Sequence, residues 1–327
     1  MPVSEFDLID RYFRRQAAQR DDVVLGIGDD AAVMQVPADR QLVVAMDTLV
    51  AGRHFPPQTA AFDIGWKALA VNLSDLAAMG ARPAWATLSL TVPAVDEDWL
   101  EGFATGFFQL AGQYQVALVG GDTTRGPLSV TVQVHGLVEN GKALRRAGAR
   151  AGQRLFITGT LGDAACALQA LRAGHSVAPD RLRRLNRPEP RVDFGLALAG
   201  SGAAVIDISD GLLADLGHLL DASQCGATLW IDRLPCAPGP GPAMEPGMLD
   251  CQLQGGDDYE LCFSLDAGQV GTLSRFAREL QLPITEIGVI EAQTGIRCRH
   301  EDGRLYTPSG TGFDHFREVV NDQGRPA

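Results

Sequence analysis

A run of small and apolar residues between Lys67 and Arg82 constrains the fold of this chain more than any other stretch. It predicts a helix built almost wholly from Ala, Leu, Val and Met, in which Asp75 is the only charged residue. Helical spacing surrounds Asp75 with small apolar neighbours and no basic side chain, so burying this carboxylate alone is costly. Either Asp75 points to water, or a cation reaches it from elsewhere.

Acidic residues recur where predicted strands meet glycine-rich or polar turns. Each junction is weak evidence alone, because aspartate is a common turn residue. Their recurrence is stronger, since open α/β folds place their chemistry at the ends of strands. The junctions are Gly28-Asp29-Asp30, Asp47 after the strand 41–46, Gly120-Gly121-Asp122 after the strand 116–119, Asp207-Ile208-Ser209-Asp210 after the strand 204–206, and Gly255-Gly256-Asp257-Asp258 before the next strand.

These acids cannot share one site without compensation, because two carboxylates about 4 Å apart repel by roughly 4 kcal/mol at an effective dielectric constant near 20. Clusters of oxygen ligands without histidine or cysteine suit Mg²⁺, which keeps waters and bridges to phosphates. Gly120 and Gly121 would let backbone N–H groups approach an anion closely, and arginines such as Arg146 would complement a nucleotide. The residues alone therefore predict metal-dependent phosphate chemistry and go no further.

Composition excludes several classes of protein. A formal net charge of −12 argues against binding nucleic acid or an anionic membrane surface. The only lysines, Lys67 and Lys142, do not fall in a GxxxxGK[ST] phosphate loop. Six cysteines without a CxxC pair predict reduced thiols, and neither a leader sequence nor a membrane-spanning run is evident. We expect a cytoplasmic protein.

The length of 327 residues predicts two domains rather than one core. The stretch 147–152 is small and rich in turn residues, so we place the boundary there, with an N-terminal domain at 1–148 and a C-terminal domain at 149–327. Asp163 and Asp215 lie in predicted helices, and we expect both side chains to be solvated.

Six motifs together resemble the thiamine-monophosphate kinase family, in the right order and over nearly the whole chain. The resemblance implies an α/β (α+β), two-domain fold like that of aminoimidazole ribonucleotide synthetase and selenophosphate synthetase, in which N-terminal domains dimerise through a shared β-barrel. It also implies ATP-dependent phosphorylation of thiamine monophosphate to thiamine diphosphate, the last step of thiamine diphosphate biosynthesis. The motifs are Gly28-Asp-Asp30, Asp47-Thr-Leu-Val with His54-Phe55, Asn72-Leu-Ser-Asp-Leu-Ala-Ala-Met-Gly-Ala, Gly120-Gly-Asp-Thr-Thr, Asp207-Ile-Ser-Asp-Gly and Gly255-Gly-Asp-Asp-Tyr-Glu-Leu.

The resemblance also implies roles for individual residues. Two departures stand out: the family often has hydroxyl residues where this chain has Ala45 and Met46, so contacts to metal there must use backbone carbonyls, and Asp257 replaces the usual glutamate. By resemblance, the ligands of several Mg²⁺ ions are Asp30, Ala45, Met46, Asp47, Asp75, Asp122, Asp207 and Asp210, the ATP contacts are Phe103, Gly121, Asp122, Arg146 and Ser209, and the contacts to thiamine monophosphate are His54, Asp257 and Phe313.

Two other functions are compatible with these motifs. One is a related ATP-using enzyme with another acceptor, such as an amidine cyclase or a selenium-activating enzyme, although the latter relies on an N-terminal cysteine and the first cysteine here is Cys166. The other is a catalytically inactive sensor of metal or nucleotide, which the intact acids disfavour. For a kinase, the acceptor phosphate is already largely deprotonated at neutral pH, so we expect direct in-line transfer without a general base.

Overall fold

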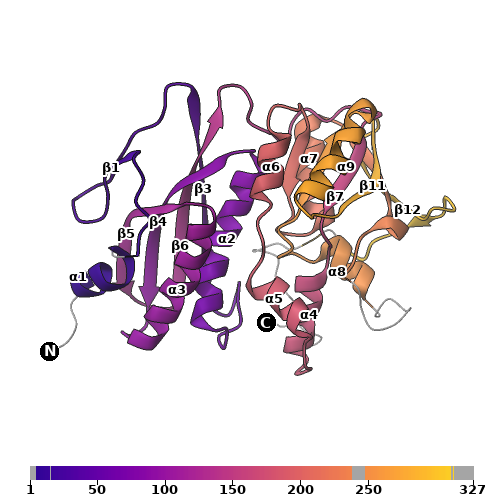
Figure 1. Ribbon diagram of the computed structural model, residues 1–327. Helices are drawn as coiled ribbons and strands as arrows, with labels where there is room; N and C mark the ends of the chain where they lie inside the picture. Colours follow the sequence, from indigo (N-terminus) through magenta and orange to yellow (C-terminus); the bar gives the residue numbers. More distant parts are fainter. Residues whose placement is uncertain (1–4, 15, 238–246, 311, 313–327) are drawn as a thin grey trace.

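The computed structural model describes residues 5–14, 16–237, 247–310 and 312, and Phe313 therefore lies outside the described residues. Its strands form a four-stranded sheet, a seven-stranded sheet and a separate two-stranded ribbon (Figure 1). The four-stranded sheet lies in the N-terminal half, and the seven-stranded sheet lies in the C-terminal half. Both large sheets are mixed, so the chain has an α/β fold.

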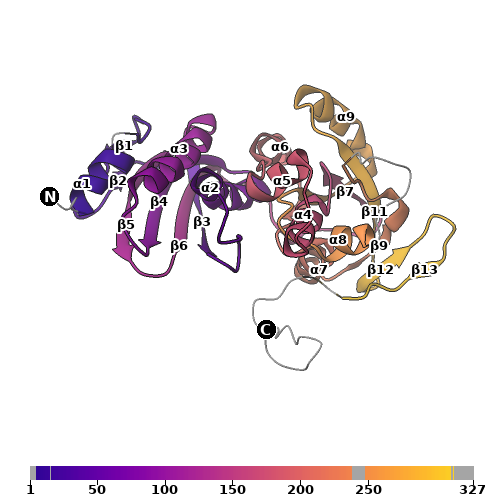
Figure 2. The same ribbon diagram turned by 90° about the horizontal axis from the view of Figure 1, so that it is seen from below.

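The N-terminal sheet has the strand order β3-β6-β4-β5, and only β4 and β5 run parallel. Its two long helices, α2 and α3, cover one face (Figure 2). Val130, Val132 and Val134 of β6 are fully buried against these helices, because alternate residues of a strand point to the same face. The elements are α1 (Glu5–Leu8), the π-helix η1 (Ile9–Arg14), β1 (Val23–Leu25), β2 (Val33–Met34), β3 (Arg40–Val50), α2 (Ala61–Ala78), β4 (Arg82–Val92), α3 (Glu97–Gln113), β5 (Ala117–Arg125) and β6 (Ser129–Glu139).

The C-terminal sheet has the order β13-β12-β9-β11-β7-β10-β8, with β12 and β9 as its parallel pair. Its apolar core packs the helix α7 against the central strands. The elements are β7 (Arg154–Thr158), α4 (Asp163–Arg172), α5 (Pro179–Asn186), α6 (Val192–Leu198), β8 (Ala204–Asp207), α7 (Leu212–Ser223), β9 (Gly226–Trp230), η2 (Ile231–Arg233), α8 (Met248–Gln254), β10 (Leu261–Leu265), η3 (Ala267–Gln269), α9 (Val270–Glu279), β11 (Ile284–Glu291), β12 (Gly295–Arg299) and β13 (Leu305–Tyr306).

Helix α2 is held on two sides by direct contact between backbones. A Cβ atom on Gly65 would lie 2.0 Å from the carbonyl oxygen of Phe103, and one on Gly106 would lie 1.9 Å from that of Phe62. On the other side, a Cβ on Gly195 of α6 would lie 2.0 Å from the oxygen of Ala77. Only glycine fits such approaches, so α2 is fixed between α3 and α6.

One expectation about the strands needs correction. Asp47 and Asp122 lie inside β3 and β5 rather than at strand ends, because the residues that follow continue the pairing to Val50 and Arg125. The four-stranded sheet is open, with β3 and β5 at its edges, so this chain alone forms no closed barrel from the described strands. None of the helices in the described part of the chain is long and apolar enough to cross a membrane.

Candidate functional site

The acids singled out in the sequence fall into two separate cavities. The central cavity has a volume of about 810 Å³ and lies between α2 and the C-terminal half. The edge cavity has a volume of about 910 Å³ and lies beside β5 and the β1 to β2 turn. The central cavity is lined by Asp47, Asp75, Asp207, Asp210 and Asp257 together with His54, Arg146 and Ser209, whereas Asp30, Gly121 and Asp122 line the edge cavity.

Polar residues of α2 orient the central acids. Asn72 accepts a hydrogen bond of 2.9 Å from the backbone N–H of Asp47 and donates one of the same length to the oxygen of Ala68. Ser74 donates a hydrogen bond of 2.7 Å to Oδ2 of Asp207 at the end of β8. Asn72 and Ser74 are fully buried, and buried polar groups in a helix of this kind require such partners. The helix thus fixes one acid from each half of the chain.

The electrostatics of the central cavity favour a cation. Burial, followed by the charges of Asp207 and Asp47, raises the pKa of Asp75 to about 8, although Arg146 opposes the shift. Burial also raises the pKa of Asp207, against the hydrogen bond from Ser74. The pKa of Asp47 is raised by desolvation and then by Asp210. These carboxyls hold protons more tightly than usual, and a positive ion would displace those protons.

The donor set fits a hard divalent ion such as Mg²⁺. The acids offer oxygen atoms only, which is the preference of that ion. Within the described ranges, no group of three or more His, Cys, Asp or Glu residues is close enough to hold a metal by itself. Mg²⁺ in general keeps several water ligands and is bound by one or two carboxylates together with substrate phosphates.

Asp215 shapes the loop that carries Ser209 and Asp210. Its Oδ2 accepts hydrogen bonds from the backbone N–H groups of Ser209, Asp210 and Gly211 at 3.0, 3.0 and 3.1 Å. The prediction that Asp163 and Asp215 are solvated was wrong, since their exposed fractions are 0% and 4%. Both carboxylates are buried because they accept local hydrogen bonds. Asp215 binds the backbone N–H groups just before α7, and Asp163 accepts a hydrogen bond of 2.6 Å from Thr160.

Only one acid of the Gly255 to Glu260 motif lines the central cavity. Asp257 has a left-handed backbone with φ of 70°, and its N–H bonds the oxygen of Ser209 at 2.9 Å. Asp258 turns inward and accepts the N–H of Gly162, and burial raises its pKa well above the usual range. Glu260 is fully buried in ion pairs with arginines of the C-terminal half. Asp258 and Glu260 therefore hold the loop that presents Asp257.

His54 follows β3 on a turn beside the same cavity. Its Nδ1 accepts a hydrogen bond of 2.9 Å from the backbone N–H of Val50. A nitrogen that accepts a hydrogen bond carries no proton, so the neutral ring bears its hydrogen on Nε2. His54 is thus set up as a hydrogen-bond donor.

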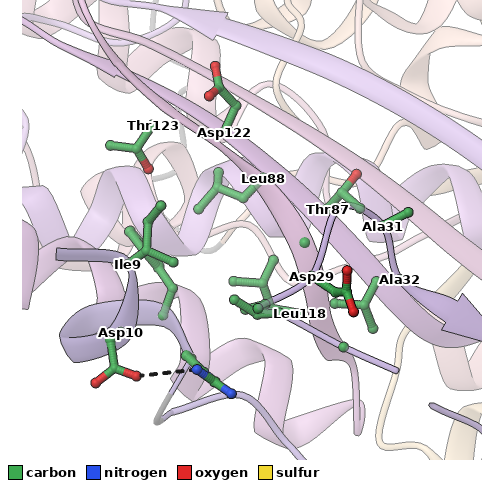
Figure 3. A pocket seen from close by; sticks show the side chains of 18 of the residues that line it. Ile9, Asp10, Asp29, Ala31, Ala32, Thr87, Leu88, Leu118, Asp122 and Thr123 are labelled. Atoms are coloured by element: carbon green, nitrogen blue, oxygen red, sulfur yellow. Dashed lines mark ion pairs between the residues drawn. The ribbon is translucent and has the colours of Figure 1, made fainter. Parts of the chain in front are cut away.

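The edge cavity is lined by the glycine-rich segments 26–28 and 120–121 of the N-terminal half (Figure 3). Asp29 and Asp122 stand on opposite sides of it, and Arg14 pairs with Asp10 at its rim. Gly121 has a φ of 151°, and a Cβ there would lie 1.8 Å from the oxygen of Leu88. Gly121 lies inside β5, and the packing of its backbone against Leu88 of β4 therefore requires glycine.

Asp47 and Gly121 occupy one cross-strand row of the N-terminal sheet. Asp47 is opposite Val132, Val132 is opposite Leu88, and Leu88 is opposite Gly121. Because neighbouring strands lie about 4.8 Å apart, the two edges are separated by about 14 Å across the sheet. One chain therefore does not bring Asp122 to the acids of the central cavity.

The remaining predicted residues are placed as follows. Phe103 is fully buried and stacks on Trp99 and Phe107, so its side chain lines neither cavity. Ala45 and Met46 lie on the edge strand β3, and the Met46 side chain is 61% exposed. Sequence reasoning missed Lys67, Ser74, Asp215 and Tyr259. Polar residues in an apolar helix were the available signal for Lys67 and Ser74, and Tyr259 belongs to the motif that begins at Gly255. Nothing local marked Asp215.

Residues 28–138 match the family "AIR synthase related protein, N-terminal domain", so the fold of this chain is of the AIR synthase-like class. Within that class, the chain belongs to the thiamine-monophosphate kinase family. It is 46% identical to the thiamine-monophosphate kinase of Escherichia coli K12, over 97% of this chain and 99% of that protein.

Solved structures agree with this family assignment. The crystal structure of thiamine-monophosphate kinase from Stenotrophomonas maltophilia K279a has a TM-score of 0.84 and 50% identity, and the match covers 94% of this chain and 99% of that one. AaThiL complexed with AMPPCP and TMP has a TM-score of 0.73 and 29% identity, with 96% and 97% covered.

Proposed function

We propose that this protein is a kinase that transfers the γ-phosphoryl group of ATP to thiamine monophosphate and forms thiamine diphosphate, the last step of its biosynthesis. The observation that carries the proposal is the meeting of Asp47, Asp75, Asp207 and Asp210 with His54 and Asp257 in one cavity. Membership of the thiamine-monophosphate kinase family supports it, as does a relative complexed with AMPPCP and TMP.

Several Mg²⁺ ions are the metal we propose, held by the acids that line the two cavities. The ligands in this proposal are Asp30, Asp47, Asp75, Asp122, Asp207 and Asp210, with the backbone carbonyls of Ala45 and Met46 on the edge strand. When bound, the ions neutralise charge on the phosphates of both substrates.

The residues of the chain bind and orient the reactants. Arg146 offers a guanidinium to the nucleotide phosphates, and the backbone at Gly121, with Ser209, provides further contacts for ATP. His54 donates its Nε2 hydrogen to the acceptor, and Asp257 and Phe313 complete that end. Phe103 is fully buried, so in this proposal it contacts adenine only in a form of the protein in which its ring is accessible.

No side chain is needed as a general base. The second pKa of a phosphate monoester is about 6, so the attacking oxygen is already largely deprotonated at neutral pH. The cost of the reaction lies in bringing two anions together, and fixed positive groups lower that cost in the transition state. We therefore propose direct in-line transfer without a phosphoenzyme.

We propose further that the protein is a cytoplasmic homodimer whose N-terminal domains, residues 1–148, close a shared β-barrel, with residues 149–327 as the second domain. Support comes from the exposed apolar side chains on one face of β3, namely Leu42, Val44 and Met46, which are 45%, 51% and 61% exposed. An apolar row on an open edge strand is a site for pairing with another chain.

Dimerisation would also complete the active site. β3 and β5 are the two edges of one sheet, so two copies placed edge to edge bring β5 of one copy beside β3 of the other. Asp122 of the second copy would then approach Asp47, Asp75, Asp207 and Asp210 of the first. This arrangement explains why one chain divides the acids between two cavities.

The function is tested by incubating the protein with MgATP and thiamine monophosphate and measuring thiamine diphosphate and ADP by chromatography. We expect both products in equal amounts. Release of ADP and inorganic phosphate without thiamine diphosphate would show that the acceptor has been assigned wrongly.

A further inference from the structure

Lys67 is an unusual residue for its position in the fold. It lies in α2, where it is the only basic residue, and it is 3% exposed. Lysine is almost never buried to this degree without a partner, because its charge loses the solvation of water. Its contacts therefore explain why it is there.

The ammonium group of Lys67 reaches the acceptor end of the central cavity. Its Nζ lies 2.9 Å from Oδ2 of Asp257, and it lies 3.5 Å from the main-chain oxygen of His54. These two partners belong to segments about 200 residues apart in the chain. One buried charge thus connects both groups that contact the acceptor in the proposed function.

Asp257 is held from a second side. The hydroxyl group of Tyr259 donates a hydrogen bond of 3.0 Å to Oδ1, so each carboxylate oxygen has one fixed partner. A carboxylate has about four sites for hydrogen bonds, and two of them remain available toward the cavity. The side chain of Asp257 is 26% exposed, which leaves it accessible to a ligand there.

We propose that Lys67 is a positioning residue for the acceptor: it holds the Asp257 carboxylate and the His54 turn in the arrangement that binds thiamine monophosphate. The inference rests on the proposed function, because it names a device of the same site. Lys67 does not line the cavity, so it acts through these two neighbours rather than on the reacting atoms.

The test compares Lys67→Met, which keeps the length of the side chain and removes its charge, with Lys142→Met. Lys142 is exposed and pairs with Glu139 on the surface, so it is a matched control. For Lys67→Met we expect the KM for thiamine monophosphate to rise about tenfold or more while kcat stays within about threefold and the KM for ATP is unchanged. The dissociation constant for thiamine monophosphate, measured by calorimetry, should rise in parallel.

A double-mutant cycle with Asp257→Asn shows whether Lys67 affects the KM for thiamine monophosphate through Asp257. If Lys67 acts through Asp257, Lys67→Met should change the KM by less than about twofold in the Asp257→Asn background. Full additivity, or a lower melting temperature with an unchanged KM, would overturn the inference, since a purely structural lysine gives those results.

Lys67→Arg keeps the test decisive if Lys67→Met does not fold. The wider guanidinium retains the charge and shifts the contact, so the KM for thiamine monophosphate should rise about threefold with a normal KM for ATP. An unchanged KM in this variant contradicts the inference. Failure of the proposed function looks different, because the wild-type protein would then form no thiamine diphosphate at all.

Discussion

Ser74 and Asp207 are 133 residues apart in the chain and are joined by a hydrogen bond of 2.7 Å, in which the Ser74 hydroxyl group donates to Oδ2. The bond connects α2 of the N-terminal half with the end of β8 in the C-terminal half. It fixes the direction of the Asp207 carboxylate at the end of β8. A buried carboxylate held in this way presents a defined atom to the cavity.

Replacing Ser74 with alanine should weaken the response to Mg²⁺. The hydrogen bond lowers the pKa of Asp207, so its loss raises that pKa further and makes the proton harder to displace. Loss of a hydrogen bond behind a metal ligand typically costs about 10- to 100-fold in metal affinity or activity. Activity measured against Mg²⁺ concentration checks this, and a curve identical to that of the wild type contradicts it.

The metal-free protein should lose stability as the pH rises. The folded-state pKa values of Asp75 and Asp215 are about 8 and about 7, above the ordinary value of 3.8. At pH values between the ordinary pKa and these raised pKa values, the folded protein binds more protons than the unfolded chain. The free energy of unfolding therefore falls with increasing pH in that range. Melting temperatures measured in chelator from pH 4 to pH 9 test whether stability falls as the pH rises.

Asp75→Asn provides the matched control for this pH dependence. The amide has no charge to bury, so the variant should melt at a higher temperature than the wild type at the alkaline end of that range, in chelator. Added Mg²⁺ should stabilise the wild type more than the variant, and Asp75→Asn should be nearly inactive. A variant less stable than the wild type at that pH would refute this account of Asp75.

Asp215→Ala should disturb the nucleotide end of the site and the fold together. It leaves three backbone N–H groups, those of Ser209, Asp210 and Gly211, without their acceptor. We expect a loss of roughly 2–4 kcal/mol in the free energy of unfolding, since a buried unpaired donor costs about 1–3 kcal/mol. Asp221→Ala, at an exposed position of the same helix, should change stability by no more than about 0.5 kcal/mol.

Two inactive variants should complement each other if the site spans two copies. In a mixed dimer of Asp122→Asn with Asp75→Asn, one site contains both changes and the other contains neither. Random exchange then restores about one quarter of the wild-type sites, because half of the dimers are mixed and each has one intact site. Activity measured after unfolding and refolding the mixture tests this, and a mixture as inactive as its components means that each site lies within one chain.

His54→Gln should mainly raise the KM for thiamine monophosphate. The predicted role of His54 is to donate a hydrogen bond, and in the structure its Nδ1 is already engaged with the N–H of Val50. A loss of turnover by several orders of magnitude at saturating substrate, restored at high pH, would falsify the mechanism without a base. Radiolabelled enzyme recovered after incubation with γ-labelled ATP alone would exclude direct transfer.

The sequence predicted local elements better than the way in which they meet. The buried helix around Asp75 was predictable, because its pattern is set by the residues themselves, although it begins at Ala61 rather than near Lys67. The pairing of Lys67 with Asp257 was not predictable, since it depends on the packing of segments 190 residues apart. Asp215 resembled an ordinary helix acid because its partners are backbone groups, which carry no signature in the sequence.

The division of the acids between two cavities was also beyond the sequence. The motifs around Asp47 and Asp122 resemble each other in composition, and nothing in either shows that β3 and β5 are opposite edges of one sheet. Strand order depends on how the whole chain folds, and a short motif does not show where its strand lies in the sheet. The motifs therefore predicted candidate site residues, whereas the structure determines which of them one chain brings together.

The glycine contacts of α2 limit how this enzyme can be redirected to new acceptors by directed evolution. Gly65, Gly106 and Gly195 put backbone against backbone, so α2 has no room to shift when a neighbouring side chain grows. Libraries that randomise α2 should consist mostly of unfolded variants. The turn 52–58 also lines the central cavity, but it lies outside this packing and contains mainly exposed or half-buried residues. Folded variants with altered acceptor specificity should therefore come mainly from substitutions in this turn.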